Sequence, residues 1–170
     1  MEKLLFLYML TRKKDYDWTM KIAIVLGLVI TITICDQITS SLFKPLVARF
    51  RPSHDIEICT MLHYVHGYRG GNYGFMSSHA ANAFGAAVFG TKIIRNKYFT
   101  ALLFTTAILV TYSRIYLGVH FLGDVVCGAA TGIMISLAVC YILGWLHSRL
   151  KRRAQRHTRP DVPPDLGIAA

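Results

Sequence analysis

Four apolar runs, each separated from the next by charged residues, constrain the fold of this chain more than any other feature of its sequence. They cover residues 22–43, 80–94, 98–112 and 121–145. Crossing the hydrocarbon core of a membrane takes about 20 residues, and fewer where a helix is surrounded by protein. In lipid only helices and closed barrels satisfy their backbone hydrogen bonds, and these runs lack the two-residue alternation of barrel strands. We therefore predict an all-α, multi-pass transmembrane helical bundle with four spans.

A shorter apolar segment precedes these runs. Residues 4–10 are apolar and are followed by Arg12, Lys13 and Lys14, without the small-residue cleavage site that ends a signal peptide. We interpret residues 1–10 as a short N-terminal helix remnant. The hydrophobic fraction of the whole chain, 54%, also exceeds that of an ordinary soluble domain.

The distribution of positive charge follows from membrane topology. The formal net charge is +10, and most basic residues fall in three clusters, within residues 12–21, 92–97 and 149–159. If each apolar run crosses once, the three clusters lie on one side, which the positive-inside rule makes the cytoplasm. We therefore expect no nucleic-acid partner. Residues 1–150 would form the transmembrane domain, and residues 151–170 a basic and then proline-containing cytoplasmic tail.

Five cations fall on the opposite face, where topology gives them no role: Lys44, Arg49, Arg51, Arg69 and Arg114. Lys44 and Arg51 belong to one segment, Lys44-x6-Arg51-Pro52, at the end of the first long run. A lysine binds phosphate oxygens as a point charge and an arginine binds them as a bidentate fork. The alternative is a cluster of interfacial cations that snorkel toward the lipid head groups.

The second long run begins just after Ser77, Ser78 and His79. Serine is a preferred N-cap, and the free N–H groups and the dipole of a helix start attract anions. His79, in the first turn, could donate a proton to a departing oxygen, or it could be a structural capping residue. This segment is a second candidate for phosphate binding.

The connection between the third and fourth runs contains Arg114, His120 and Asp124. His120 and Asp124 are four residues apart and would share one face of a helix. A carboxylate that accepts from one imidazole nitrogen fixes the tautomer and leaves the other nitrogen free as a nucleophile. The alternative is a buried histidine–aspartate pair with a structural role.

Together the three segments resemble the signature of the type-2 phosphatidic acid phosphatase superfamily, which also includes the vanadium haloperoxidases. The motifs that carry the resemblance are Lys44-x6-Arg51-Pro52, Ser77-x-His79 and Ser113-Arg114-x5-His120-x3-Asp124. The haloperoxidase activity is disfavoured because those relatives are soluble. The resemblance points to the bacterial membrane lipid phosphatases.

The resemblance implies an enzyme without a metal or cofactor, in the bacterial inner membrane, with its active site facing the periplasm. It implies that His120 attacks phosphorus, that Asp124 orients His120, and that His79 protonates the leaving lipid oxygen. The transition-state oxygens would be held by Lys44, Arg51, Arg114, Ser77 and the backbone N–H of Ser78. These roles agree with the needs of phosphoryl transfer, which are charge neutralisation, in-line geometry and a proton donor.

Two features depart from the family pattern. The middle motif usually reads Pro-Ser-Gly-His, whereas here residues 76–79 read Met-Ser-Ser-His, so Ser78 replaces a glycine that permits close backbone approach. The membrane members usually have six spans, and the resemblance places the start of this chain within the equivalent of the second. Either the chain is naturally short or its recorded start is late.

Two further residues are candidates for supporting roles. Asp36, near the outer end of the first long run, would pair with a basic residue around the site or make a polar contact between helices. Arg69 would contact a phosphate or head group from an external loop. That loop is a candidate lid or a set of interfacial anchors, and its aromatic, histidine and glycine residues are His63, Tyr64, His66, Tyr68, Gly70, Gly71 and Tyr73.

We therefore expect a membrane-embedded lipid phosphatase whose partner is a phosphorylated membrane lipid, with an oligomeric state that the sequence does not define. Candidate substrates are undecaprenyl diphosphate, phosphatidylglycerophosphate, phosphatidic acid and the phosphates of lipid A. One alternative is a metal-dependent membrane hydrolase, with ligands drawn from His54, Asp55, His63, His66, His79 and His120. Another is a non-catalytic lipid-binding or transport subunit, which would tend to lose His120, Asp124 or Arg114.

Overall fold

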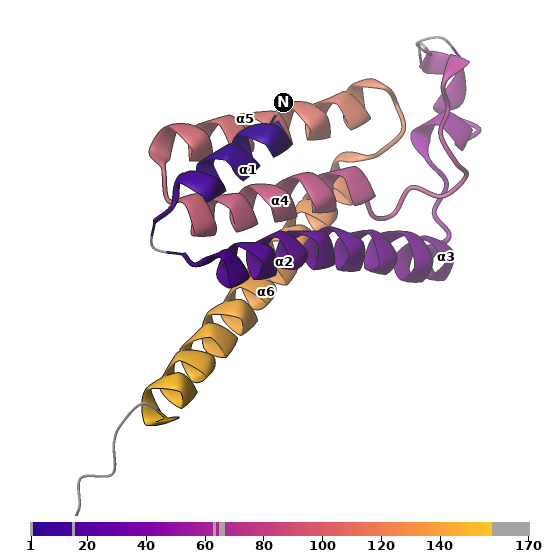
Figure 1. Ribbon diagram of the computed structural model, residues 1–170. Helices are drawn as coiled ribbons and strands as arrows, with labels where there is room; N and C mark the ends of the chain where they lie inside the picture. The colour runs from indigo at the N-terminus through magenta and orange to yellow at the C-terminus, as the bar shows by residue number, and fades with distance from the viewer. Residues whose placement is uncertain (1, 15, 63, 65–66, 158–170) are drawn as a thin grey trace, which may run out of the picture.

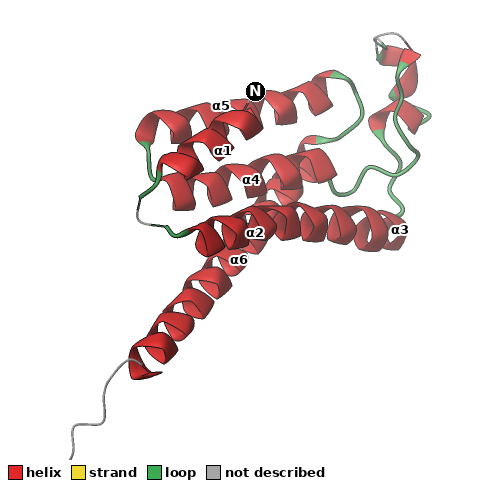
Figure 2. Cartoon of the chain, in the orientation of Figure 1, coloured by secondary structure: helices red, strands yellow, loops and turns green. Residues whose placement is uncertain are grey.

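The computed structural model describes residues 2–14, 16–62, 64 and 67–157. Its helices are α1 (Glu2–Arg12), α2 (Trp18–Gln37), a π-helical continuation (Ile38–Phe43), α3 (Lys44–Val47), α4 (Ser78–Ile94), α5 (Lys97–Tyr116) and α6 (Leu122–His157). The 3-10 turns Pro52–His54 and Cys59–Met61 lie in the connection between α3 and α4. The described residues form no strand, only an isolated bridge between Phe50 and Tyr73. The all-α prediction is confirmed (Figure 2).

Three helical segments of the described chain are long and apolar enough to cross a membrane: Trp18–Val47, Lys97–Tyr116 and Leu122–Gln155. The remaining predicted span, residues 80–94, lies within α4, which has 17 residues. Figure 1 shows α4 in the middle of the bundle, and it contacts α1, α2, α5 and α6. Neighbouring helices therefore cover much of its surface, and Ala80, Ala81 and Phe89 are fully buried.

Side-chain caps fix where the main helices begin. Asp17 accepts from the backbone N–H of Met20 at the start of α2, and Asn96 accepts from that of Phe99 at the start of α5. Ser77 caps α4 by accepting from the N–H of Ala80. Such caps satisfy N–H groups that lack a partner within the helix, typically for about 1 kcal/mol each.

Helices α4 and α6 pack closely because α6 carries glycines at the contact. A Cβ atom on Gly128 would collide with the carbonyl oxygen of Ser77, and one on Gly132 would collide with that of Ala81. Small residues let two helix backbones approach in this way within a membrane. Since Ser77 begins α4 and Asp124 lies one turn before Gly128, this packing holds the start of α4 against the start of α6.

The buried apolar cluster lies at the end of α4 away from Ser77. It contains Phe6, Leu10, Ile24, Phe89, Ile93, Ile94 and Phe99. The rings of Phe6 and Phe99 stack at 6.4 Å between centroids, so α1 is packed into the bundle through its apolar side chains. The polar residues of the predicted site gather at the opposite end.

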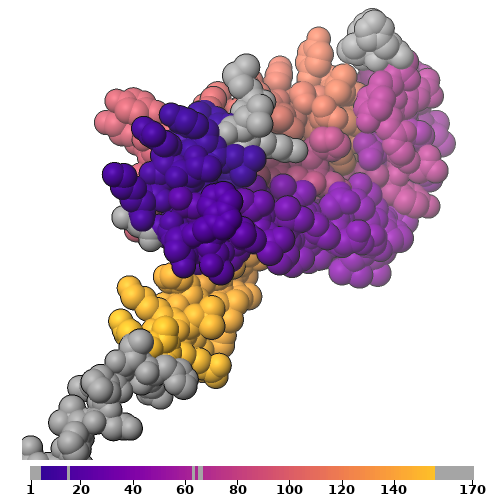
Figure 3. Space-filling model, in the orientation of Figure 1, coloured from indigo at the N-terminus to yellow at the C-terminus, as the bar shows by residue number. Residues whose placement is uncertain are grey.

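Helix α6 continues beyond the packed body of the protein. Figures 1 and 3 show its later part projecting away from the other helices. The predicted boundary at residue 150 falls inside this helix, which continues to His157. The guanidinium carbon of Arg149 lies 4.2 Å from the ring centroid of Trp145 on the projecting part. Residues 158–170 of the predicted tail lie outside the described part of the chain.

Candidate active site

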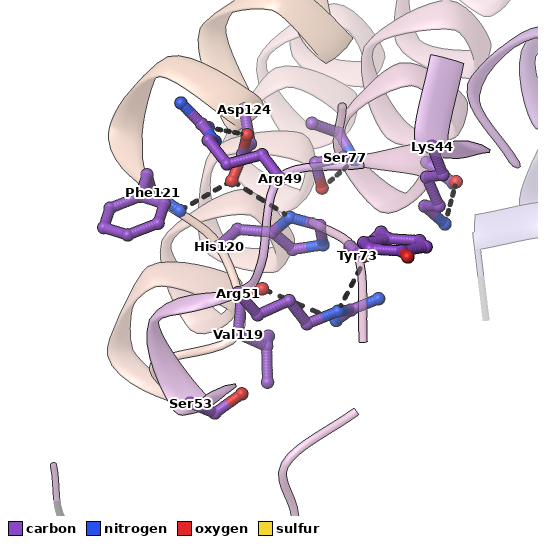
Figure 4. Close-up of polar contacts among 12 residues, drawn as sticks. Lys44, Arg49, Arg51, Ser53, Tyr73, Ser77, Val119, His120, Phe121 and Asp124 are labelled. Atoms are coloured by element: carbon purple, nitrogen blue, oxygen red, sulfur yellow. Dashed lines mark hydrogen bonds and ion pairs between the residues drawn. The ribbon is translucent and has the colours of Figure 1, made fainter. Parts of the chain in front are cut away.

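The candidate site is assembled at one end of the bundle from four separate segments (Figure 4). These are the end of α2 with α3, the connection between α3 and α4, the start of α4, and the link between α5 and α6. Backbone hydrogen bonds join them: Ser53 N–H donates to Gly118 O at 3.0 Å, and Ser77 N–H donates to Asp124 O at 3.0 Å. The three predicted motifs therefore meet in space.

His120 and Asp124 form the buried centre of this arrangement. Their exposed fractions are 3% and 0%, and His120 Nδ1 lies 3.6 Å from Asp124 Oδ2. That distance is too long for a hydrogen bond, and Nδ1 has no hydrogen-bond partner among the described residues. The two side chains lie close together, but the predicted hydrogen bond between them is not formed, and the shared helix face is wrong. Helix α6 begins at Leu122, so His120 lies in the preceding turn.

The start of α6 explains this difference. The Asp124 carboxylate turns back and accepts from the backbone N–H of Phe121 at 2.8 Å, as a residue in the first turn of a helix does when it caps that helix. The capping contact places Oδ2 near the residue that precedes Phe121, which is His120. The proximity of the pair therefore comes from a helix start and its turn.

A second oxygen of the carboxylate is held by a residue that the sequence did not single out for the site. Arg49 Nη2 donates to Asp124 Oδ1 and forms an ion pair with it. The Arg49 guanidinium also lies 4.9 Å from the ring centroid of Phe121 and 5.4 Å from that of Phe75. Arg49 is thus a third member of the histidine–aspartate centre.

Lys44 is held beside the start of α4 by Ser78. Lys44 Nζ donates to Ser78 Oγ at 3.0 Å, and the hydroxyl oxygens of Thr39 and Ser40 lie 2.7 and 3.0 Å from the same atom. Thr39 and Ser40 belong to the π-helical segment Ile38–Phe43, and Lys44 follows it directly. The segment therefore brings all three side chains to the Ser78 hydroxyl. Single π-helical turns within α-helices are frequent at functional sites. Asp36 Oδ1 accepts from Ser40 Oγ at 3.4 Å and so reaches Lys44 through Ser40.

Arg51 joins the connection between α3 and α4 to the link between α5 and α6. Its Nε donates to Tyr73 O at 3.1 Å, and its Nη1 lies 3.5 Å from Val119 O, next to His120. Gly70, at φ +70°, leaves room for the guanidinium, since a Cβ atom there would lie 2.6 Å from Arg51 Nη1. Burial lowers the pKa of Arg51, although the Tyr68 and Asp124 side chains oppose that shift.

An open pocket of about 450 Å³ lies beside this arginine. Its lining residues are Ser40, Lys44, Pro45, Arg51, Gly71, Asn72 and Tyr73. The pocket therefore joins the two predicted phosphate-binding cations of the first motif to the connection between α3 and α4. A phosphorylated head group could enter the site from this side.

His79 and Arg114 complete the set of predicted residues. Arg114 Nε donates to Ser113 Oγ at 3.2 Å at the end of α5, and His79 is exposed in the first turn of α4. Although its residue surface is exposed, the imidazole is partly desolvated by its neighbours, which lowers the pKa of His79, and the charges of Arg114, His120, Lys44 and Arg51 lower it further. His79 therefore faces the same group of cations that the motifs supply.

Arg69 belongs to the candidate lid, of which Gly71 and Tyr73 line the pocket beside Arg51. The Arg69 guanidinium lies 4.6 Å from the ring centroid of Tyr64, and its carbonyl accepts from Ser53 Oγ at 2.7 Å. The predicted head-group contact of Arg69 stays a prediction. His63 and His66 lie outside the described residues, and the described residues hold no group of three or more His, Cys, Asp or Glu arranged to bind a metal ion.

The comparisons with known proteins agree with this geometry. The sequence profile described as the PAP2 superfamily matches residues 22–148, which include all three motifs. The chain belongs to the PAP2 superfamily. The family resemblance inferred from the motifs is therefore confirmed.

Two bacterial relatives in the PAP2 superfamily carry the same functional name. The chain is 42% identical over 145 residues to the lipid A 4'-phosphatase of Porphyromonas gingivalis, covering 85% of this chain and 60% of that protein. It is 35% identical over 151 residues to the lipid A 4'-phosphatase of Bacteroides thetaiotaomicron, covering 88% and 64%. The chain thus spans less than two thirds of the length of either relative. No solved structure is significantly similar to it.

Within the PAP2 pattern, Arg49 is the residue that sequence reasoning missed. It lies inside the first motif, between Lys44 and Arg51, but the motif leaves its position unspecified. One signal was available, because Arg49 is one of the five cations that the predicted topology leaves without a role. Its contact with Asp124 depends on how the chain folds back after α3, which residue spacing does not reveal.

Proposed function

We propose that this protein is an integral membrane lipid phosphatase, and that a phosphate of lipid A is its foremost candidate substrate. The observation that carries the proposal is the convergence of Lys44, Arg51 and the His120–Asp124 pair at one end of the bundle. Membership of the PAP2 superfamily and the names of the two relatives support it. Undecaprenyl diphosphate, phosphatidylglycerophosphate and phosphatidic acid remain competing substrates.

The proposed reaction passes through a phosphohistidine. The ring nitrogen of His120 that faces away from Asp124 attacks phosphorus, so an N–P bond forms as the P–O bond to the lipid breaks. The lipid oxygen leaves with a proton from His79, and water then hydrolyses the N–P bond and releases phosphate. Asp124 stabilises the positive charge that develops on the imidazole.

The cations of the three motifs neutralise the transferring group. Lys44, Arg51 and Arg114 hold its equatorial oxygens, and Ser77 with the backbone N–H of Ser78 adds the start of α4. Electrostatic stabilisation of this kind is usually the largest single contribution in phosphoryl transfer. Asp36 supports Lys44 through Ser40, and Arg69 contacts the head group from the external connection.

For His79 to act as the acid, its pKa must rise when the substrate binds. In the free protein, partial burial and then the surrounding cations lower the pKa of His79, which favours its neutral form. A bound phosphate dianion cancels those charges and raises the pKa again, so that the protonated donor is present when a lipid oxygen must leave. Burial likewise lowers the pKa of His120, while the nearby Asp124 carboxylate opposes the shift, and the net effect favours the neutral form of the nucleophile.

The proposed setting is the inner membrane of a bacterium with the site on the periplasmic face. The three segments with spanning character support a membrane location. We propose that α4 is a fourth crossing, shortened because other helices surround it. Residues 1–150 form the catalytic domain in this proposal, and the basic residues from 151 onward lie in the cytoplasm.

The function is tested by measuring phosphate release from purified protein across lipid A and the three competing lipids. We expect release from lipid A, full activity in a chelator, inhibition by vanadate, and no activity in His120→Ala. Release that requires a divalent cation would favour a metal-dependent hydrolase. Absence of release from every lipid, with lipid binding retained in a well-folded preparation, would favour a non-catalytic lipid-binding protein.

A further inference from the structure

Arg49 holds a position in the site that the proposed reaction does not yet use. It is the cation that contacts the fully buried Asp124 carboxylate, while its own side chain is 43% exposed. Burial of a carboxylate is costly unless its oxygens are hydrogen-bonded and its charge is paired. The two protein groups that satisfy Asp124 in this structure are the Arg49 guanidinium and the Phe121 N–H.

The carboxylate oxygens are divided between these partners. Oδ1 accepts from Arg49, whereas Oδ2 accepts from Phe121 N–H at 2.8 Å and lies 3.6 Å from His120 Nδ1. A carboxylate oxygen has two acceptor lone pairs. Oδ2 therefore keeps one acceptor position free on the side of His120, and the carboxylate cannot rotate toward or away from His120 without breaking the Arg49 contact.

Arg49 is itself held in place. Its guanidinium lies between the rings of Phe75 and Phe121, at 5.4 and 4.9 Å from their centroids. Its carbonyl oxygen accepts from Gly74 N–H at 2.9 Å, in the segment that leads to α4. Figure 4 shows Arg49 beside Asp124, with Arg51 on the far side of the His120 ring. The aromatic rings and the backbone contact restrict the arginine to this position.

We propose that Arg49 is a positioning residue, which anchors Asp124 through Oδ1 so that Oδ2 orients His120 for attack on phosphorus. This inference rests on the proposed function, because it assumes that His120 is the nucleophile. Arg49 also supplies a positive charge that partly balances Asp124. The imidazole is then oriented by the carboxylate without being held in its protonated, non-nucleophilic form.

The charges that face His120 come from every neighbouring element. The charged or titratable groups around His120 are Asp124 in α6, Arg51 in the connection after α3, Lys44 in α3 and His79 in α4. Arg49 acts on this group through its ion pair with Asp124. Replacing Arg49 by a neutral residue removes this ion pair. The pKa of His120 should then rise, because the Asp124 carboxylate beside it is no longer paired with a cation.

The test compares Arg49→Gln and Arg49→Lys with the parent, using Arg149→Gln as the control. Arg149 also packs on an aromatic ring, that of Trp145, but lies on the projecting part of α6. The kinetic constants are measured against pH with a lipid and with an aryl phosphate. For Arg49→Gln we expect kcat to fall by about tenfold to a hundredfold with little change in KM. The acidic midpoint of the kcat/KM profile should move to higher pH, and Arg49→Lys should restore most of that midpoint.

A second readout does not depend on turnover. The pKa of the His120 ring, measured by NMR on histidine-labelled protein in detergent, should rise in Arg49→Gln and stay unchanged in Arg149→Gln. An unchanged His120 pKa would overturn the inference, and so would a loss confined to KM, which would make Arg49 a direct substrate contact. If the parent releases no phosphate, the proposed function fails, and the NMR titration still decides whether Arg49 controls the pair.

Discussion

At the scale of single residues, the sequence predicted which residues gather at the site, but it did not predict the contact between Arg49 and Asp124. Lys44, Ser78 and His120 lie at helix ends, and successive helix ends on the same side of a membrane must meet, so spacing and topology were enough to group them. The partner of Asp124 was not predictable in the same way. Arg49 reaches Asp124 only because the chain turns back after α3, where Ala48 adopts the left-handed conformation at φ 49°.

Ser78 provides the prediction at this scale, because it departs from the usual glycine of the family motif. In Ser78→Gly, Lys44 loses the hydroxyl that it contacts at 3.0 Å and becomes free to leave the site. We expect kcat/KM to fall about tenfold, as for loss of one hydrogen bond to a charged group. Steady-state kinetics on a lipid phosphate measure the effect.

The matched control is Ser41→Ala, in the same π-helical segment. The Ser41 hydroxyl donates to Gln37 Oε1 at 3.0 Å and is exposed. This variant should keep the parent kinetics. Equal kinetics for Ser78→Gly and the parent would mean that Ser78 does not position Lys44.

At the scale of the elements, the sequence predicted where helices lie but not how their ends are shaped. Apolar runs indicate helices, and this expectation holds for α2, α4, α5 and α6. The π-helical turn at Ile38–Phe43 has no such signal, because it depends on the contacts of Thr39 and Ser40 with α4. The late start of α6, which leaves His120 in a turn, likewise depends on the cap formed by Asp124.

The contact between α4 and α6 gives the prediction at this scale. Gly132→Ala adds a methyl group where it would collide with the Ala81 carbonyl, so the helices must separate and the start of α4 must move away from Asp124. We expect a destabilisation of about 1–3 kcal/mol and a loss of activity of about a hundredfold. Thermal unfolding in detergent and phosphate release measure the two effects.

Gly144→Ala on the same helix is the control. A Cβ atom at Gly144 meets no other heavy atom within 4 Å. Alanine is the better helix former, so this variant should be as stable as the parent or more stable, by up to about 1 kcal/mol. Similar losses in both variants would show that the α4–α6 contact does not hold the site together.

At the scale of the whole molecule, we propose that the site and the basic clusters lie on opposite faces of a membrane. The charge clusters predicted this arrangement, and the separation of the apolar cluster around Phe89 from the polar end around His120 is consistent with it. The central burial of α4 was not foreseen, because a run of 15 apolar residues looks alike in sequence whether it faces lipid or protein.

Labelling in intact cells tests the topology. In a Cys59→Ser background, a cysteine at Gly71 should react with an impermeant thiol reagent, and a cysteine at Lys97 should react only after permeabilisation. Gly71 is a better probe position than Gly70, because an added side chain at Gly70 meets Arg51 whereas Gly71 is open. The reverse labelling pattern would place the site in the cytoplasm and contradict the proposed orientation.

The central claim, that His120 receives the phosphoryl group, is tested most directly by trapping the intermediate. Enzyme quenched in alkali during turnover of a phosphate-labelled lipid should carry a base-stable, acid-labile label that maps to the His120 peptide. The label should be absent from His120→Ala. It should form slowly in Asp124→Asn, because the neutral amide no longer fixes the productive tautomer. An active preparation that carries no label at any quench time would contradict the account and point to direct attack by water.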